Sequence, residues 1–538
     1  MEAGGEHRFR RRRFVLGAAT GAAAALAMPA WLRPGSGPRS AHALAAPPEP
    51  FARALPIPRE LTGSNLTIPI EPAEVKILPG RKTKMWTYDG TFPGPTIRRP
   101  SGERTTVRFK HRLPEKAGDL TVHLHGAHTR SKDDGQPGGL TRSQPRSFYC
   151  DISPGLSERE SGNNVLIKPG SEREYRYDFT EDGADERAAM HWYHDHRLDR
   201  TGENVWRGLA GMWITEDAVD LALPLPRGDR DLPLMIADRD FDSKNQLKDP
   251  FDHLIPPNDG AQGKHVLVNG AVLPYHEVSA QRHRIRILNA SNFRSYNLFF
   301  EGPSAPPMAQ IATEAGLIPD ALPRDKILLG PGERAEVIVD FATAQGEDLV
   351  LRSGPRDDGE VALGSKPYNG PIMQFRVADE TLSDDTAEPQ NLDLPPLPPW
   401  TQTVSGSSPV DFEWNVSGGF AGNPWRINGK TFNPAKVETK PELGTVVVWR
   451  ISNNTNVAHM MHPHHTDWYA LERRQGSDPP VPPPPEEDCL KETFFLDPFE
   501  SIKIAGKMSD YTGKYVMHCH MLDHEDHGLM SQFEVVEP

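Results

Sequence analysis

Residues 518–527 read His-Cys-His-Met-Leu-Asp-His-Glu-Asp-His, and they hold four of the 21 histidines and one of the three cysteines in the chain. In an extended strand, side chains two residues apart point to the same side. His518 and His520 should therefore face one way and the sulfur of Cys519 the other. A thiolate with two imidazoles is a ligand set that favours a soft transition metal over magnesium or calcium. This stretch predicts a strand with a metal site on each face.

Three further windows concentrate histidine in the same way. They are His-Leu-His at 123–125, His-Trp-Tyr-His-Asp-His at 191–196 and His-Met-Met-His-Pro-His-His at 459–465. Histidines of an ordinary core would be scattered, whereas concentrated His and Cys sets are typical of metal sites. Structural zinc is the competing interpretation, but zinc sites use several cysteines or one compact set. Here ten or more histidines from both ends of the chain accompany a single thiolate, so the ligand count favours copper.

The composition favours strands outside these windows as well. The 538 residues are too many for one hydrophobic core, and roughly 150 residues per domain gives three or four domains, of which we take three. The 53 prolines and 46 glycines suit short strands and many turns. Residues 283–288 and 335–341 alternate apolar and polar side chains, as half-buried strands do. We expect an all-β protein.

Two proline-rich breaks, at 221–228 and 392–399, interrupt the strand pattern and divide the chain. We expect domain 1 at residues 47–220, domain 2 at 229–385 and domain 3 at 398–538. The metal-type residues then fall in the first and third domains. A stiff proline-rich insertion at 478–485 should form a surface loop or border a substrate entrance.

Residues 1–46 have the features of a targeting segment. Arg11, Arg12 and Arg13 precede a weakly apolar run from Gly17 to Met28. Small residues that suit cleavage follow near position 43. The segment resembles a twin-arginine signal peptide, which implies export to the periplasm or the extracellular space. A basic anchor or a chance arginine cluster is the alternative.

The remainder of the chain should be acidic and without a membrane span. No other stretch reaches the ~18 apolar residues that a span requires. Residues 1–46 hold seven Arg and two Glu, so their removal changes the net charge from -14 by -7 and +2, to about -19. An acidic surface argues against nucleic acid as a partner.

The four windows resemble the four copper-binding motifs of the three-domain multicopper oxidases, the family of laccases, bilirubin oxidases and phenoxazinone synthase. Glu203-Asn204, residues 207–211, 267–270 and 284–289 extend the resemblance beyond the motifs. It implies three consecutive cupredoxin-like Greek-key β-barrel domains. It also implies four copper ions as cofactor: one type 1 ion, one type 2 ion and a type 3 pair.

The resemblance carries ligands over by position. The type 1 copper would be bound by His459, Cys519 and His524, and the type 2 copper by His123 and His462. The type 3 pair would be bound by His125, His194, His196, His464, His518 and His520. The first and third domains would then share the three-copper cluster. The remaining window histidines, expected behind the ligands or at the surface, are His128, His191, His465 and His527.

Asp134 and Glu525 align with acidic residues that resemble the proton-supplying carboxylates of the family. Reduction of dioxygen to water consumes protons, so a buried acid beside the cluster would have a use. An ordinary turn aspartate and a surface glutamate are the alternative.

The sequence departs from the family at two positions of the type 1 site. Met460 stands where a proline commonly follows the type 1 histidine. Leu529 stands ten residues after Cys519, where this branch usually has an axial methionine, and Met530 comes one step late. Leucine cannot ligate, and copper without a thioether should favour Cu(I). We therefore expect a raised reduction potential.

The implied activity is one-electron oxidation of a phenolic or aminophenolic substrate at the copper bound by Cys519, coupled to four-electron reduction of dioxygen to water. A metallo-oxidase for Cu(I), Fe(II) or Mn(II) is the alternative, although the 14 methionines are dispersed rather than gathered in one segment. A non-catalytic exported cupredoxin scaffold is a third interpretation, but scaffolds of this family have lost copper ligands. We expect a monomer, and a disulfide between Cys150 and Cys489 stays open.

Overall fold

The computed structural model describes residues 49–139, 163–251, 260–356, 367–419 and 424–538. These residues fold mainly into strands, which confirms the all-β expectation. The α-helices among them are short: α1 (Thr201–Arg207), α2 (Ala218–Ala222) and α3 (Leu522–Asp526). The proposed signal peptide at 1–46 and Cys150 lie outside the described residues. Within the described ranges, no helix is long and apolar enough to cross a membrane.

The first strand group (residues 60–216) forms two main sheets. The five-stranded sheet has the order β1 (Glu60–Leu61), β4 (Gly94–Pro100), β11 (Ala210–Glu216), β10 (Ala189–Asp195) and β6 (Val122–His125). The four-stranded sheet has the order β3 (Thr83–Tyr88), β2 (Asn65–Val75), β5 (Thr105–His111) and β7 (Glu172–Tyr177). A small separate hairpin joins β8 (Thr180–Glu181) and β9 (Ala184–Asp185).

The middle strand group (residues 231–381) has the same two-sheet plan. Its seven-stranded sheet has the order β14 (Ala271–Val272), β13 (His265–Val268), β12 (Asp231–Arg239), β16 (Arg282–Asn289), β21 (Arg334–Asp340), β18 (Met308–Thr313) and β19 (Gly316–Arg324). Its five-stranded sheet has the order β15 (Tyr275–Ala280), β23 (Gly370–Thr381), β22 (Asp348–Ser353), β17 (Tyr296–Glu301) and β20 (Ile327–Leu329).

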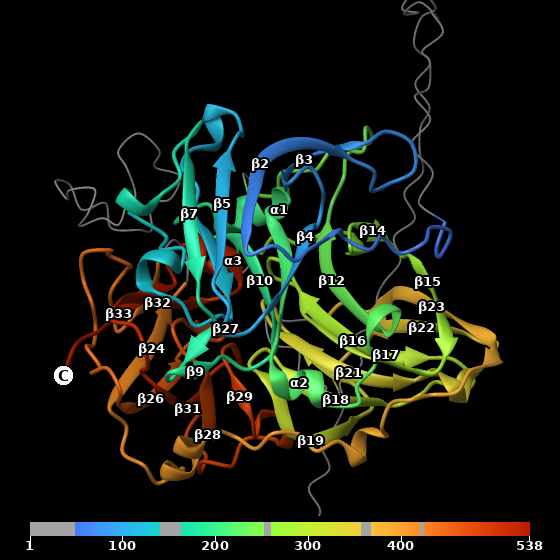
Figure 1. Cartoon of the computed structure of the whole chain (residues 1–538). Helices are drawn as coiled ribbons and strands as arrows, with labels where there is room; N and C mark the ends of the chain where they lie inside the picture. The colour runs from blue at the N-terminus through green and yellow to red at the C-terminus, as the bar shows by residue number, and fades with distance from the viewer. Residues whose placement is uncertain (1–48, 140–162, 252–259, 357–366, 420–423) are drawn as a thin grey trace, which may run out of the picture. The chain divides into compact units, whose positions relative to one another are not determined.

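The last strand group (residues 412–535) completes the molecule (Figure 1). Its six-stranded sheet has the order β25 (Trp425–Ile427), β24 (Phe412–Gly418), β26 (Val446–Asn453), β31 (Glu500–Lys507), β28 (Trp468–Gln475) and β29 (Leu490–Lys491). Its four-stranded sheet has the order β30 (Phe494–Leu496), β27 (His459–Pro463), β32 (Gly513–Cys519) and β33 (Met530–Val535). The division into domains at 47–220, 229–385 and 398–538 stays a prediction.

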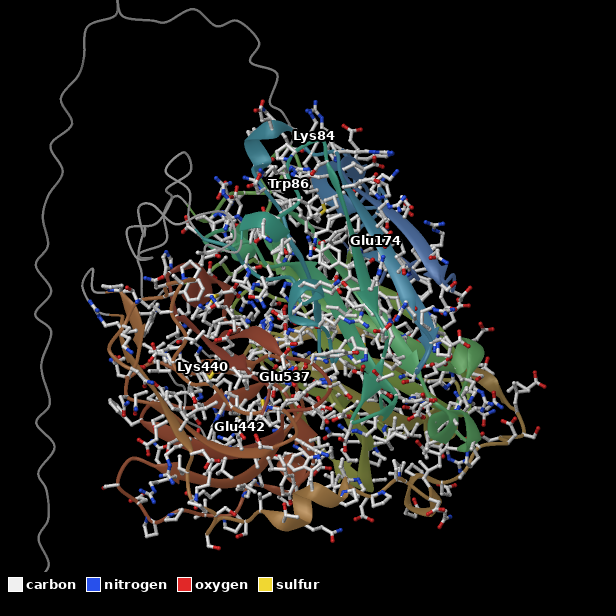
Figure 2. The ribbon with its side chains drawn as sticks, turned by 60° about the vertical axis from the view of Figure 1, so that its left-hand side comes forward. Lys84, Trp86, Glu174, Lys440, Glu442 and Glu537 are labelled. Atoms are coloured by element: carbon white, nitrogen blue, oxygen red, sulfur yellow. The ribbon has the colours of Figure 1, made fainter. Side chains whose placement is uncertain are left out.

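Each strand group packs its sheets around a hydrophobic core. Some strands alternate in burial, but β16 and β21 are buried on both faces, so the expectation of half-buried strands at 283–288 and 335–341 is wrong. In β5 the buried side chains of Val107 and Phe109 are separated by the exposed Arg108. Val337 and Val339 of β21 belong to the core of the middle group. Trp449 of β26 belongs to the core of the last group. Charged side chains such as Lys84, Lys440, Glu442 and Glu537 lie at the surface (Figure 2).

Strand register places the histidine windows opposite one another. In the first group, His194 of β10 pairs with His123 of β6. In the last group, His462 of β27 pairs with His518 of β32, and Met461 pairs with Cys519. The two groups meet where α1 packs against α3, and the backbone N–H of Thr201 donates to the Asp526 carboxylate at 2.9 Å. The histidine strands of the two groups are therefore held together at this junction.

Candidate metal centre

One candidate site consists of His459, Cys519 and His524, whose ligand atoms all lie within 4.8 Å of one another. They come from the start of β27, the end of β32 and α3. The Cys519 sulfur is 3.6 Å from Nδ1 of each histidine. Nε2 of His459 contacts the Thr455 hydroxyl at 3.1 Å, which leaves Nδ1 facing the sulfur. Two imidazoles and a thiolate in this arrangement suit a blue-copper site.

Aromatic packing encloses this site. The Trp425 ring contacts both imidazoles, with ring centroids 4.8 Å from His459 and 4.7 Å from His524. Phe293, from the middle strand group, packs edge-on against His524 at 5.2 Å. Burial raises the pKa of the Cys519 thiol to about 12. A coordinated cation would displace that proton.

Leu529 lies next to Cys519 in the fold, and its place at the axial position of a type 1 copper stays a prediction. Leu529 is buried in the same hydrophobic cluster as Cys519, and its carbonyl accepts a hydrogen bond from the Cys519 N–H at 3.0 Å. Met530 pairs with His518 on the neighbouring strand and packs instead with Val516 and Phe432. The thioether of Met530 therefore belongs to the face of β32 opposite the Cys519 sulfur.

A second and larger site gathers eight buried imidazoles from both strand groups. They are His123, His125, His194, His196, His462, His464, His518 and His520. His123 stacks on His464 with centroids 4.0 Å apart, and His125 stacks on His462 at 3.9 Å. Each stacked pair joins the first group to the last. The predicted alternation holds, because His518 and His520 enter this cluster while Cys519 enters the other site.

In several of these imidazoles one ring nitrogen is hydrogen-bonded and the other has no protein partner, whereas His520 has none at either nitrogen among the described residues. Nδ1 of His462 and of His194 contact backbone carbonyls at 2.8 Å, and their Nε2 atoms have no protein partner. In His125 the two nitrogens exchange roles: Nε2 contacts the Glu492 carboxylate, and Nδ1 has no protein partner. Nε2 of His518 lies 3.1 Å from Nε2 of His464 and 3.2 Å from Nε2 of His196. Metal-bound histidines use one nitrogen for the metal and the other for a partner that fixes the ring.

The electrostatics of the cluster also suit a metal ion. Burial, and after it the neighbouring imidazoles, hold the pKa values of His125, His194 and His462 well below the usual range. The rings are therefore neutral near pH 7, which is the form that binds metal. A site built from eight imidazoles favours copper over magnesium or calcium. The donor set fits copper at both sites.

Asp134 and Glu525 are both buried beside the cluster. The Asp134 carboxylate contacts Nδ1 of His464 at 2.9 Å, and its backbone carbonyl contacts Nδ1 of His123. The Glu525 carboxylate contacts Nδ1 of His518 at 3.1 Å and accepts a hydrogen bond from the Thr201 hydroxyl at 2.7 Å. Each acid therefore touches the outer nitrogen of an imidazole, and neither lies in an exposed turn.

Four other window histidines stay outside the two sites. His128, His191 and His465 are buried, and His527 is half-buried. His128 contacts the backbone carbonyls of His465 and Ser509. His128, His191 and His465 are therefore not surface residues, and a place behind the ligands stays a prediction.

Sequence reasoning missed Glu492. Its Oε1 lies 2.9 Å from Nε2 of His125, and its backbone carbonyl lies 2.8 Å from Nδ1 of His462. Its surroundings, Leu-Lys-Glu-Thr-Phe at 490–494, resemble no metal motif and offer no signal. The structure alone places this carboxylate at the cluster.

The proline-rich insertion lies at the surface, where Val481 is 55% exposed. Its end, at Pro484, lines a cavity of about 260 Å³ together with Leu329 and Phe495. The sequence also predicts a loop at 354–369 that would shape a substrate pocket, and its residues 357–366 lie outside the described residues. Cys489 is buried, and whether it pairs with Cys150, which lies outside the described residues, stays open.

Comparisons with known proteins agree on one family. Two family models, both described as multicopper oxidase, match residues 70–147 and 393–538. A laccase of Bacillus subtilis is 30% identical over 502 residues, covering 85% of this chain and 91% of that protein. A bilirubin oxidase of Albifimbria verrucaria is 30% identical over 458 residues, covering 83% of this chain and 72% of that protein.

Solved structures give the same result. The multicopper oxidase McoA of the hyperthermophile Aquifex aeolicus superposes with a TM-score of 0.73 at 29% identity. The match covers 90% of this chain and 99% of that one. The similarity therefore extends over all three strand groups and both candidate sites.

Proposed function

Because the chain belongs to the multicopper oxidase family and is an oxidase of the laccase type, we propose that it oxidises a phenolic or aminophenolic substrate by one electron at a time and reduces dioxygen to water by four. The observation that carries the proposal is the position of Cys519. Its sulfur enters one site, while its covalent neighbours His518 and His520 enter the other. The two sites are therefore joined through bonds of the chain itself.

We assign the type 1 copper to His459, Cys519 and His524, and the type 2 copper to His123 and His462. The type 3 pair takes His125, His194, His196, His464, His518 and His520. The ring nitrogens that have no protein partner among the described residues support this assignment, as does the separation of the cysteine from the eight imidazoles. Copper would supply one-electron redox chemistry at both sites.

The protein orients the imidazoles, keeps water away from them and supplies protons. The buried sites exclude water from the imidazoles, and hydrogen bonds to the outer nitrogens fix the rings. Asp134 and Glu525 are the residues we propose to supply protons, because each is a buried acid bonded to an imidazole of the cluster.

The substrate class rests on the relatives. The names laccase and bilirubin oxidase favour an aromatic reducing substrate for this chain. A metallo-oxidase for Cu(I), Fe(II) or Mn(II) is compatible with the same copper sites and is the alternative. We also propose export by the twin-arginine-type segment at 1–46, a monomeric state, and three domains at 47–220, 229–385 and 398–538.

Oxygen uptake by the copper-loaded protein without residues 1–46 tests the proposal. o-Aminophenol and a methoxyphenol are compared with Cu(I), Fe(II) and Mn(II), and Cys519→Ser serves as the blank. Uptake with the arenes that is absent in Cys519→Ser is the expected result. Uptake with the metal ions alone would replace the aromatic substrate by a metal ion, and no uptake by a fully blue protein would contradict oxidase function.

A further inference from the structure

Among the described residues, the middle strand group supplies none of the proposed copper ligands, yet one of its turns reaches the three-copper site. The turn at 330–334 connects β20 to β21. The Gly330 N–H donates to the Glu333 carboxylate at 2.7 Å, and the Glu333 N–H donates back to the Gly330 carbonyl at 3.1 Å. Gly332 has a φ of +89°, and a Cβ there would lie 2.9 Å from the His520 ring. The turn therefore packs directly on one proposed ligand.

Arg334, the last residue of this turn, joins several parts of the chain. Its buried guanidinium donates from Nε to the Met190 carbonyl of β10 at 2.7 Å and from Nη2 to the Glu314 carbonyl at 3.1 Å. Nη1 donates to the Gly332 carbonyl at 3.1 Å and pairs with the Glu492 carboxylate. A planar guanidinium can donate to several fixed acceptors in different directions at once, whereas the compact ammonium of a lysine cannot reach all of them.

Two of the four acceptors, Gly332 and Glu492, contact proposed copper ligands, and a third lies on a ligand-bearing strand. Met190 lies on the same strand as His194. Gly332 packs on His520. Glu492 contacts Nε2 of His125 at 2.9 Å and, through its backbone carbonyl, Nδ1 of His462 at 2.8 Å. One residue therefore contacts a ligand from the first strand group through its carboxylate and a ligand from the last through its backbone carbonyl.

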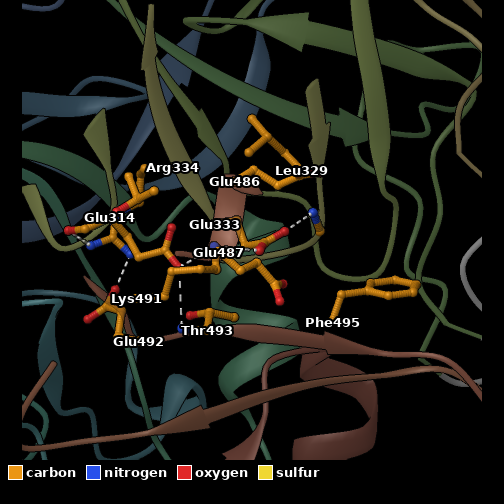
Figure 3. Close-up of polar contacts among 12 residues, drawn as sticks. Glu314, Leu329, Glu333, Arg334, Glu486, Glu487, Lys491, Glu492, Thr493 and Phe495 are labelled. Carbon is orange, nitrogen blue, oxygen red and sulfur yellow. Dashed lines mark hydrogen bonds and ion pairs between the residues drawn. The ribbon is translucent and has the colours of Figure 1, made fainter. Parts of the chain in front are cut away.

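The segment that carries Glu492 is itself anchored to the middle group. Nζ of Lys491 lies 2.8 Å from Glu314 and 3.1 Å from Glu333, and both carboxylates are buried (Figure 3). The Thr493 N–H donates to the same Glu314 carboxylate at 3.4 Å. These bonds flank Glu492 on both sides and fix the backbone from which it reaches the cluster.

A purely stabilising ion pair does not account for this geometry. Replacing a buried ion pair by packed apolar residues is often neutral or stabilising, so a contribution to stability does not by itself explain why such a pair is present. The same strand group contains Arg284, which is equally buried between Asp220 and Glu336. In the described part of the chain the acceptors of Arg284 contact no proposed ligand, whereas two of those of Arg334, Glu492 and Gly332, do.

We propose that Arg334 is a positioning residue for the three-copper site, through Glu492 to His125 and His462 and through the 330–334 turn to His520. The inference rests on the proposed function, since it concerns the site assigned there. It gives the ligand-free middle group a role, which is to set the orientation of imidazoles contributed by its two neighbours.

Arg334→Met tests the role by spectroscopy and copper content. The variant should keep the blue absorbance of the copper bound by Cys519, and its type 2 copper should give an altered electron paramagnetic resonance spectrum. Competition with a chelator should show copper affinity at the three-copper site lowered by about 10- to 100-fold, the usual loss when a partner of a metal ligand is removed. Arg334→Lys, which can keep the ion pair with Glu492 but not the other bonds, should shift the same spectrum by less.

Arg284→Met is the matched control, because it also removes a fully buried guanidinium, in this case one that lies between the Asp220 and Glu336 carboxylates. It should lower the unfolding midpoint comparably and leave the type 2 spectrum unchanged. The positioning role would be overturned if Arg334→Met and Arg284→Met changed the spectrum equally. It would also be overturned if either Arg334→Met or Arg334→Lys left the spectrum unchanged. If the parent protein bound no copper at the eight imidazoles, the proposed function itself would fail before any variant was compared.

Discussion

At the scale of single residues, the sulfur of Cys519 receives a hydrogen bond that the usual family sequence could not provide. Met460 stands where a proline is common, and its backbone N–H lies 3.4 Å from the sulfur. Proline has no N–H to donate. Hydrogen bonding around the cysteine sulfur tunes the reduction potential of a blue-copper site, and a donor favours Cu(I) by stabilising charge on the sulfur.

Met460→Pro should therefore lower the reduction potential of the type 1 copper. A redox titration that follows the blue absorbance measures the change. Met460→Leu keeps the N–H and should leave the potential near that of the parent. Equal potentials in Met460→Pro and the parent would mean that this hydrogen bond has no influence on the copper.

Leu529 leads to a second prediction about the same potential. Leu529→Met supplies a thioether at the axial position, which stabilises Cu(II), so the potential should fall. The same titration reports the change. Met530→Leu should leave the potential unchanged because Met530 packs with Val516 on the opposite face of β32. A shift in Met530→Leu would place its sulfur at the copper and contradict the structure.

Residue-scale prediction from sequence succeeded where the chemistry is local. His518, Cys519 and His520 are adjacent, so strand alternation alone assigns them to two sites. Glu492 and Arg334 could not be found that way. They are 158 positions apart, and their contact is created only when β21 and the 490–493 segment pack together. No local pattern in the sequence encodes that contact.

At the scale of elements, charged pairs lie inside the sheets of the middle strand group. Asp231 of β12 contacts Arg286 of β16 at 2.7 Å, and both side chains are buried. Burial would raise the pKa of Asp231, but Arg286, with Arg284 and Arg98 behind it, outweighs burial and lowers the pKa from 3.8 to about 2. The sequence predicted β16 from its apolar alternation but not this partner of its arginines.

The lowered pKa of Asp231 makes stability depend on pH. A carboxyl whose pKa falls on folding contributes stability above its unfolded value, near pH 4, and loses it as the pH falls toward 2. A shift of about two units corresponds to about 2 kcal/mol. The parent and Asp231→Asn should therefore differ in unfolding free energy, and this difference should be about 2 kcal/mol larger at pH 7 than near pH 2.

Urea unfolding at both pH values measures that difference. Asp385→Asn serves as the control because Asp385 pairs with Arg230 at the surface, where ion pairs contribute little. A gap between parent and Asp231→Asn that does not change with pH would contradict the lowered pKa.

At the scale of the whole molecule, the eight-imidazole site that we propose holds three coppers lies between strand groups that are distant in the sequence. His123 and His125 come from the first group, and His462 and His464 come from the last. A metal that binds the folded state and not the unfolded chain stabilises folding, by about 4 kcal/mol when its free concentration is 1,000 times its Kd.

Removal of copper should therefore lower the unfolding midpoint of the entire molecule. Calorimetry of the copper-loaded and copper-depleted protein measures the shift. Cys519→Ser, which lacks a type 1 ligand but keeps the eight imidazoles, should retain much of the stabilisation. Magnesium added to the depleted protein should restore nothing, because it prefers oxygen ligands. Equal midpoints with and without copper would show that the cluster does not hold the groups together.

The order in which the ligands stand along the chain has a consequence for biogenesis. The first imidazoles, at 123 and 125, leave the ribosome long before those at 518 and 520. At about 5–20 residues per second, the interval is on the order of tens of seconds. Throughout that time the nascent first strand group presents half of a metal site with no counterpart. We expect metallation to follow synthesis of the entire chain, so a truncated translation product would carry imidazoles but no assembled cluster.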